Sequence, residues 1–392
     1  MVIAVSRCCP EFRGRIRENR TVTDATPPPS ATPGTRWSST RAWEWYEAQP
    51  WIVGCNFIPS TAINQLEMFQ ADTFDEATIA RELDLAASIG MNSVRTYLHD
   101  LLHREDPEGF LERVDRFLAI ASERGIRPTL VLFDDCWNAE GAPGLQPEPG
   151  PGVHNSGWLQ SPLRGHRGHA ELPRLRAYVA AVVGRFARDQ RVLMWDLFNE
   201  PGNSRYHDES EALLRLAFEE ARRVDPDQPL TVGVWYDNYR LSALQVELSD
   251  VVTFHNYSSA RHLLGHIYGL KSHGRPVICT EWMARTKQSI VERCLPIFRR
   301  ERVGCYNWGL VDGKTNTIHA WGKPLPDGEP KVWFHDLFRR DGAPYRQAEI
   351  DAFRFATGLS GENDVKFRRI ERGGGLNDNS FDARDTPASS RS

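Results

Sequence analysis

The feature that most constrains the fold of this 392-residue chain is a strand-like segment followed by a helix-like segment, repeated eight times. The strand-like segments are short apolar runs at 51–58, 91–98, 127–133, 191–199, 229–235, 250–257, 275–282 and 302–311. The helix-like segments have apolar residues at helical spacing, at 74–90, 107–125, 172–189, 209–225, 241–248, 260–273, 287–301 and 345–357. Strands that are apolar on both faces are typical of a parallel sheet covered by helices. The pattern therefore predicts an α/β fold, a (β/α)8 TIM barrel formed as a single domain.

An open, doubly wound sheet is the alternative fold for the same alternation. Such sheets commonly bind a nucleotide through a glycine-rich loop after the first strand. The first strand here is followed by "PSTAINQLEMF", which has no glycine. This absence favours the barrel.

Two loops are much longer than the usual connections of a barrel. Residues 134–172 follow the third strand, and residues 311–343 follow the eighth. Long loops in compact domains are usually functional. Because the first loop contains Trp137, Trp158, His154 and Asn155, we expect the two loops to wall a short substrate pocket.

The composition divides the chain into three parts. Residues 1–42 contain "TDATPPPSATPGTRWSST", and residues 359–392 are rich in Gly, Asp, Asn and Ser. Segments that bury so little apolar surface do not order by themselves. We therefore expect a disordered amino-terminal arm (1–42), the barrel (43–358) and a disordered carboxyl-terminal tail (359–392).

Charge and hydropathy exclude several classes of partner. The net charge is -4 without a dominant basic stripe, so nothing indicates nucleic acid. No apolar run reaches the about 18 residues that cross a membrane, and the start of the chain has no clear secretory signal. We expect a cytoplasmic protein with buried free thiols, needing no cofactor or metal; the sequence leaves its oligomeric state open.

Polar and aromatic residues gather where the predicted strands end, at the edge where such barrels carry their active sites. Those that we expect to contact a substrate are Asn56, Arg95, Trp137, Asn199, His255, Tyr257, Trp282 and Trp308. Two carboxylates, Glu200 and Glu281, end strands four and seven. These strands lie three apart around the ring, so the carboxylates can meet across its mouth. A carboxylate pair that flanks a sugar bond is the minimum needed for glycoside hydrolysis.

The motifs at these strand ends resemble those of clan A glycoside hydrolases, most closely cellulase-like members in or near family 5. The resemblance covers about residues 51–357. It rests on "NSVRTY", "WDLFNEP", "TFHNY", "ICTEWM" and "YNWGLVDGK".

The resemblance implies a retaining double displacement that cleaves β-linked oligo- or polysaccharides. Glu200 matches the family's acid/base, and Glu281 matches its nucleophile. Asn199 matches the residue that holds the sugar 2-hydroxyl, and Arg95 matches the arginine beneath the nucleophile. His255 and Tyr257 match a His-x-Tyr pair whose tyrosine orients Glu281, and Trp308 matches the tryptophan floor under the sugar. The earlier polar pair of the family has no clear match, because His99, Asp134 and Asp135 all stand in that region.

Three other functions fit parts of the pattern. A barrel that binds carbohydrate without turnover would keep the fold but lose the chemistry. A transglycosidase would use the same two carboxylates with a sugar as acceptor. A metal-dependent hydrolase would use His99, Asp134 and His255 instead, and its activity would be lost with a chelator.

Overall fold

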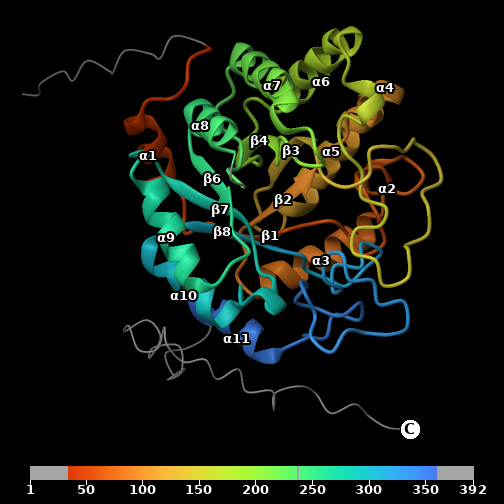
Figure 1. Ribbon diagram of the computed structural model, residues 1–392, viewed down its shortest axis with the longest axis vertical. Helices are drawn as coiled ribbons and strands as arrows, with labels where there is room; N and C mark the ends of the chain where they lie inside the picture. Colours follow the sequence, from red (N-terminus) through yellow and green to blue (C-terminus); the bar gives the residue numbers. More distant parts are fainter. Residues whose placement is uncertain (1–33, 236–237, 360–392) are drawn as a thin grey trace, which may run out of the picture. The chain divides into compact units, whose positions relative to one another are not determined.

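The computed structural model describes residues 34–235 and 238–359, and these form the predicted barrel (Figure 1). The parallel strands are β1 (Val53–Asn56), β2 (Ser93–Tyr97), β3 (Thr129–Asp134), β4 (Met194–Asn199), β5 (Leu230–Thr231), β6 (Val252–His255), β7 (Val277–Trp282) and β8 (Gly304–Trp308). They follow one another in the order β5-β4-β3-β2-β1-β8-β7-β6. Single-residue pairing of Val234 with Phe254 joins β5 to β6 and closes the ring. The (β/α)8 prediction is confirmed.

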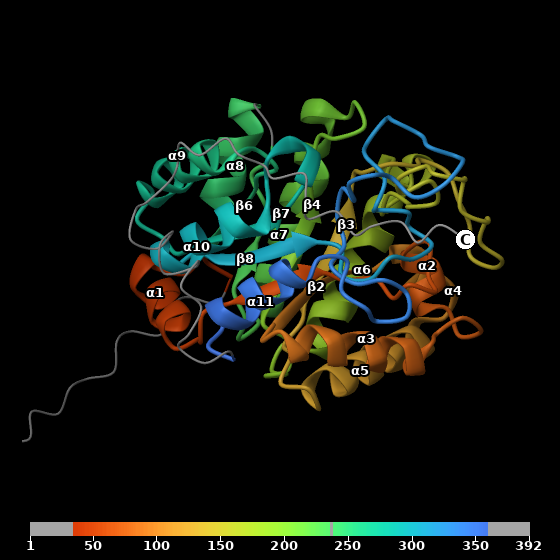
Figure 2. The same ribbon diagram turned by 90° about the horizontal axis from the view of Figure 1, so that it is seen from below.

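Helices surround the strands, as Figures 1 and 2 show from two directions. They are α1 (Ser39–Glu47), α2 (Gln65–Phe69), α3 (Glu76–Ser88), α4 (Asp100–Glu105), α5 (Pro107–Ser122), α6 (Leu172–Arg185), α7 (Ser210–Val224), α8 (Tyr239–Leu248), α9 (Ala260–Lys271), α10 (Val291–Glu301) and α11 (Gln347–Ala356). Short 3₁₀ helices lie at Arg164–His166, His169–Glu171, His207–Glu209 and Arg285–Lys287. The eight predicted helices correspond to α3 and to α5 through α11. Helices α1, α2 and α4 were not predicted.

The folded region begins earlier than the predicted boundary at residue 43. Trp37 is buried, and its backbone N–H donates to Asp250 at 2.8 Å. Ser38 caps the start of α1 by accepting from the backbone N–H of Arg41. Because Trp37 supplies apolar surface that its Pro- and Thr-rich neighbours lack, it anchors this segment to the barrel. Residues 1–33 and 360–392, which hold the rest of the two predicted disordered ends, lie outside the described residues.

The fifth strand is much shorter than predicted. The run 229–235 predicted a full strand, but regular pairing covers only Leu230 and Thr231. Beyond it, Gly233 lies against the ring of His255, and a Cβ at Gly233 would come within 2.9 Å of His255 Nε2. Regular strand pairing is thus lost at the point where the backbone of Gly233 lies against the side chain of His255 at the barrel mouth.

The two long loops lie side by side over one sector of the barrel mouth, as both views show. Hydrogen bonds join them directly. The backbone N–H of Asn155 donates to Thr315 O at 2.8 Å, and Asn316 Nδ2 donates to Gly150 O at 2.9 Å. His154 Nδ1 lies 2.8 Å from His319 O. These loops form a continuous wall, which we call the loop wall (residues 134–172 and 311–343).

Candidate active site

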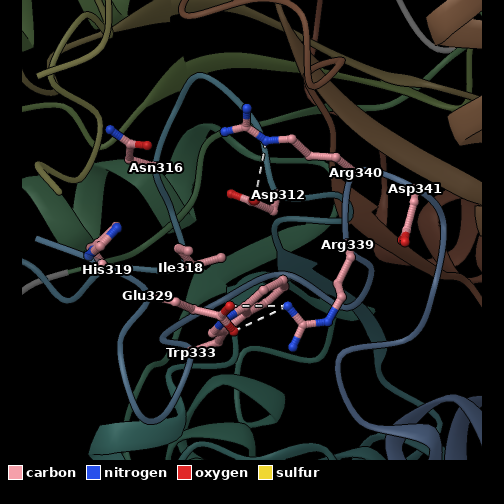
Figure 3. Close-up of a pocket in the computed structure, with 10 residues that line it drawn as sticks. Asp312, Asn316, Ile318, His319, Glu329, Trp333, Arg339, Arg340 and Asp341 are labelled. Atoms are coloured by element: carbon pink, nitrogen blue, oxygen red, sulfur yellow. Dashed lines mark hydrogen bonds and ion pairs between the residues drawn. The ribbon is translucent and has the colours of Figure 1, made fainter. Parts of the chain in front are cut away.

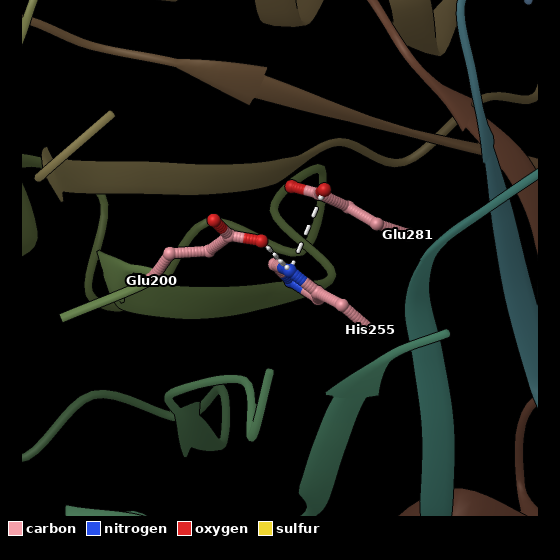
Figure 4. A group of neighbouring side chains, drawn as sticks. All are labelled: Glu200, His255 and Glu281. Atoms are coloured by element: carbon pink, nitrogen blue, oxygen red, sulfur yellow. Dashed lines mark hydrogen bonds and ion pairs between the residues drawn. The ribbon is translucent and has the colours of Figure 1, made fainter. Parts of the chain in front are cut away.

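Glu200 and Glu281 meet at the mouth of the barrel (Figure 4). Glu200 directly follows β4, and Glu281 is the last residue but one of β7. A ring nitrogen of His255 and one carboxylate oxygen from each glutamate lie within 4.8 Å of one another. Carboxyl groups about 5–5.5 Å apart are characteristic of retaining glycosidases, whereas inverting enzymes hold them farther apart.

The backbone at Glu200 has the left-handed conformation, with φ 46°. This conformation costs of order 1 kcal/mol or more in a residue other than glycine. The turn that follows is held by a hydrogen bond from the backbone N–H of Asn203 to Glu200 O, at 3.0 Å. Strain of this kind is typical of a side chain that is placed for function.

Glu281 is held by a charged group and two hydroxyl groups. Arg95 Nη1 donates to its Oε1 at 2.8 Å, and Tyr97 Oη donates to the same oxygen at 3.0 Å. Tyr257 Oη donates to Oε2 at 2.8 Å, so the predicted contact between Tyr257 and Glu281 is present. Burial raises the pKa of Glu281 above its usual value, and the nearby Glu200 adds to this, while Arg95 and Tyr257 oppose the rise. Because Arg95 touches Glu281 directly, its charge favours the ionised form of this carboxyl.

Arg95 also organises the floor of the site. Its guanidinium is fully buried and donates to Asp196 at 2.9 Å, to Asn56 at 2.8 Å and to Asn199 at 2.7 Å. Asn56 is turned so that its Nδ2 donates to Thr280 O at 2.8 Å. Both asparagines therefore present their Oδ1 to the guanidinium, which fixes the orientation of each amide.

The surroundings of Glu200 are neutral. His255 Nδ1 lies 2.7 Å from Oε1, Asn203 Nδ2 donates to Oε2 at 2.6 Å, and Cys136 Sγ donates to Oε2 at 3.3 Å. Burial raises the pKa of Glu200, and the hydrogen bonds from Cys136 and Asn203 oppose this. Burial lowers the pKa of His255 to about 4, so its imidazole is neutral at neutral pH.

Asp134 supports Asn199 from the end of β3. Its Oδ1 accepts from Asn199 Nδ2 at 2.9 Å and from the backbone N–H of Cys136 at 2.9 Å. Its Oδ2 accepts from Trp158 Nε1 at 2.8 Å. Burial raises the pKa of Asp134 to about 7. This carboxyl therefore connects the loop wall to the residue that precedes Glu200.

The aromatic residues divide into two groups. Trp308 lies beside Tyr97 and Trp158, with ring centroids 6.0 and 5.7 Å away, and Trp137 stands at the rim with 40% of its surface exposed. Trp282, which was predicted to bind substrate, is fully buried and packs on Phe298 of α10 at 5.2 Å. That prediction is wrong, because neighbouring residues of a strand point to opposite faces. Glu281 faces the barrel mouth, so Trp282 faces the helices.

Several groups that hold the carboxylates were not predicted from the sequence. Tyr97 has a detectable signal, because it stands two residues after Arg95 in β2 and so faces the same side. Cys136 and Asn203 have none, since each lies in a turn whose path the sequence does not specify. The three residues His99, Asp134 and His255 of the metal-hydrolase alternative are not brought together among the described residues. His99 instead accepts from the backbone N–H of Leu101 and caps α4.

One group in the described part of the chain has the donor atoms for a metal ion, and it consists of Glu200, His255 and Glu281. Arg95 already places a positive charge 2.8 Å from Glu281. A cation in this group would be repelled by that guanidinium, so the donor set suits a proton-transfer site better than a metal centre.

A cavity lies elsewhere, within the loop after β8 (Figure 3). It measures about 460 Å³ and is lined by residues such as Asn316, His319 and Trp333. Arg339 is paired with Glu329 at 3.2 Å, and Arg340 with Asp312 at 3.3 Å. Because both guanidinium groups are neutralised and no catalytic pair is present, this cavity is not the candidate active site.

A smaller cavity of about 10 Å³ lies behind the loop wall, next to Trp308 and Asn155. Both amide atoms of Asn155 are buried and have no hydrogen-bond partner in the protein. A cavity of that size holds one water molecule at most.

No helix in the described part of the chain is long and apolar enough to cross a membrane. Comparison of the sequence with curated proteins finds no match. The family model "Cellulase (glycosyl hydrolase family 5)" matches residues 57–314, which is more than half of the chain.

Solved structures with the same fold include glycosidases of this family. An exo-β-1,4-mannosidase, Op5Man5, from Opitutaceae bacterium strain TAV5 is similar at 19% identity with a TM-score of 0.55, over 79% of this chain; the chain spans 59% of that enzyme's length. A GH5_18 protein from Streptomyces cattleya in complex with Manβ1-4GlcNAc is similar at 14% identity and a TM-score of 0.55, over 81% of this chain and 80% of that one. A GH5_18 protein from Bifidobacterium longum subsp. infantis is similar at 16% identity and a TM-score of 0.53, over 79% of each chain. With the family model matched across the barrel, the chain belongs to glycosyl hydrolase family 5 and is a glycosidase that acts on carbohydrate.

Proposed function

We propose that this glycosidase cleaves β-glycosides with retention, using Glu281 as the nucleophile and Glu200 as the acid/base. The observation that carries the proposal is the asymmetry of the pair. Glu281 contacts Arg95 directly, at 2.8 Å, whereas the groups that are hydrogen-bonded to Glu200 are neutral. An ionised carboxylate and a protonated one, close together, are what the first step of double displacement needs.

In the first step, Glu281 attacks the anomeric carbon while Glu200 gives its proton to the leaving oxygen. The glycosidic bond breaks, and the sugar is held as an ester on Glu281. In the second step, Glu200 takes a proton from water, the water oxygen attacks the anomeric carbon, and Glu281 is released. Asn199, held by Arg95 and Asp134, would bind the sugar 2-hydroxyl in both steps. Trp308 would stack on the sugar ring.

The loop wall supports a short β-linked oligosaccharide as the substrate, rather than a long polymer. A polymer needs an open groove on both sides of the scissile bond. Hydrogen bonds between the two long loops close the sector beside β1, β2 and β8. Of the similar structures, one is an exo-β-1,4-mannosidase and another is in complex with the disaccharide Manβ1-4GlcNAc.

The test is a panel of aryl β-glycosides and β-linked disaccharides, followed by labelling with a 2-fluoro sugar. We expect hydrolysis with retained configuration, a label on Glu281, and loss of more than about 1,000-fold in kcat/KM for Glu281→Gln. Near-wild-type activity in that variant would end the proposal. If the enzyme hydrolyses disaccharides more slowly than the internal bonds of a polysaccharide of the same sugar and linkage, the proposal of a short substrate is wrong.

The same panel decides between two related functions. A transglycosidase would pass the sugar from Glu281 to an added sugar acceptor, so the disaccharide product would exceed the free sugar. A barrel that only binds carbohydrate would retain the sugars without releasing any product. The contacts of Arg95, Tyr97 and Tyr257 to one carboxylate favour chemistry over binding alone.

A further inference from the structure

Glu200 carries two different oxygens. Oε2 accepts from Asn203 Nδ2 at 2.6 Å and from Cys136 Sγ at 3.3 Å. Oε1 lies 2.7 Å from His255 Nδ1. The carboxyl proton is less stable on an oxygen that already accepts two hydrogen bonds, because there it would face two other donors. We therefore expect the proton on Oε1.

The sulfur of Cys136 is held as rigidly as the carboxylate that it contacts. It accepts from Asn199 Nδ2 at 3.4 Å and from Asn203 Nδ2 at 3.3 Å. The backbone N–H of Cys136 is fixed on Asp134. With its lone pairs facing two amide groups, the thiol is left with its S–H directed at Glu200.

The surroundings of Cys136 also keep it protonated. Burial raises the pKa of the thiol, and the carboxylates of Asp134, Glu200 and Glu281 raise it further. A thiolate is therefore disfavoured at any pH at which the site works. The group is a donor rather than a nucleophile.

We propose that Cys136 is a positioning residue for the acid/base: with Asn203 it occupies Oε2 of Glu200 and so places the transferable proton on Oε1. This inference rests on the proposed roles of Glu200 and Glu281. In the His255 tautomer that carries its proton on Nε2, Nδ1 lies 2.7 Å from Oε1 and accepts a hydrogen bond from the Oε1 proton without taking it. When substrate enters, the same proton passes to the leaving oxygen as the electron pair of the broken C–O bond moves onto that oxygen.

The test compares aryl glycosides that need proton donation with those that do not. A phenyl leaving group requires an acid, and a 2,4-dinitrophenyl group leaves without one. Replacing Cys136 by Ala should lower kcat/KM on the phenyl glycoside by about 10-fold, the effect of one lost hydrogen bond to a reacting group, and on the dinitrophenyl glycoside much less. Cys136→Ser, which restores a donor, should recover most of the loss, and Asn203→Ala should behave like Cys136→Ala.

The pH profile supplies a second readout. The thiol lowers the pKa of Glu200, so its removal should move the alkaline limb of kcat/KM to higher pH even as the rate falls. The other charged and titratable groups that face the carboxyl or the thiol are unchanged in the variant, and they are Arg95, Asp134, His255 and Glu281. A shift of the alkaline limb in Cys136→Ala would therefore be caused by the loss of the hydrogen bond from the thiol to Glu200.

Cys294→Ala is the matched control. Cys294 is a buried free thiol in α10 whose sulfur lies 4.0 Å from Ser289 Oγ, so its loss should leave both substrates and the pH profile unchanged. Equal losses on the two substrates in Cys136→Ala, or no loss, would overturn the inference. Glu200→Ala separates the two proposals. If it cleaves the phenyl glycoside like wild type, the proposed function fails; if it fails selectively on that substrate and Cys136→Ala does not, only the inference on Cys136 fails.

Discussion

The two carboxylates occupy the same barrel mouth but different electrostatic environments. Glu281 is held by the Arg95 guanidinium and by the hydroxyls of Tyr97 and Tyr257. Glu200 is held by a thiol, an amide and a neutral imidazole, none of which carries charge at neutral pH. Burial alone would treat both groups alike, so the partners decide which one ionises.

The difference arises from the framework beneath each residue. Arg95 is itself paired with Asp196 in β4, and both side chains are fully buried. A buried guanidinium with carboxylate partners cannot lose its charge, so Glu281 always faces a cation. Glu200 follows the end of its strand in a turn, where small neutral side chains from loops reach it. The barrel supplies the fixed charge, and the loops supply the neutral donors.

Apart from replacing a catalytic carboxylate itself, the largest expected effect comes from changing Arg95, the charged partner of Glu281. Arg95→Lys keeps the charge but cannot reach Glu281, Asn199, Asn56 and Asp196 together. We expect kcat/KM to fall by about 100-fold or more, because several oriented donors are lost at once. Steady-state kinetics on an aryl glycoside would measure this.

Arg222→Lys is the control for that experiment. Arg222 is a largely buried arginine of α7 that makes two hydrogen bonds of 2.7 Å to Asp250, which precedes β6. The same substitution there should leave the kinetics unchanged. Equal activity in the two lysine variants would show that the guanidinium does not organise the site.

A smaller effect is expected from removing the Tyr257 hydroxyl, a neutral hydrogen-bond donor to Glu281. Tyr257 lowers the pKa of Glu281, so in Tyr257→Phe the carboxylate is protonated at a higher pH. The acid limb of kcat/KM should therefore move to higher pH, with a loss of about 10-fold at the optimum. Tyr306→Phe removes a buried hydroxyl that is hydrogen-bonded to Ser93 and Thr129, and it should leave the acid limb in place. An acid limb that stays fixed in Tyr257→Phe would contradict the assignment of Glu281 as the ionised partner.

The barrel was predictable because a short run of mostly apolar residues marks the position of each strand in the sequence. The positions of Glu200, Glu281 and Arg95 follow from that pattern, since strand ends meet at one edge. The direction of Trp282 was also available, because it adjoins Glu281 in a strand and must face away from it. Trp282 was nevertheless predicted to bind substrate because it stands in "ICTEWM", which resembles a family motif.

The rest of the site depends on contacts that no local pattern encodes. Cys136 contacts Glu200 across two turns, whose backbone is left-handed at Trp137 (φ 70°) and at Glu200 (φ 46°). Trp37 was missed because one tryptophan stands in a segment of disorder-prone composition, and its partner Asp250 is distant in sequence. Such pairings are set by tertiary packing, which overrides local propensity.

The smallest expected effect is on the free energy of unfolding, which we expect to change in opposite directions when each of the two glutamates is replaced by glutamine. Burial raises the pKa of Glu200 above its unfolded value, so the folded state binds more protons than the unfolded state, and stability falls as pH rises through this range. Glu200→Gln removes that cost and should stabilise the fold by about 1 kcal/mol at neutral pH. Because Glu200 is protonated in the folded wild type at low pH, the gain should shrink as pH falls.

Glu281→Gln is the matched substitution, and it should not stabilise the protein. Burial raises the pKa of Glu281 as well, but this substitution also removes the carboxylate beside Arg95. A buried guanidinium then loses one of its charged partners, and leaving a buried charge less well compensated is destabilising. Urea unfolding of the two variants and the wild type at several pH values would measure both changes. If the two variants shift the free energy of unfolding in the same direction and by the same amount, the two carboxylates do not differ in charge state, and the asymmetry that assigns their roles disappears. If they shift in opposite directions, the acid and the nucleophile are already distinguished in the free protein, before any sugar binds.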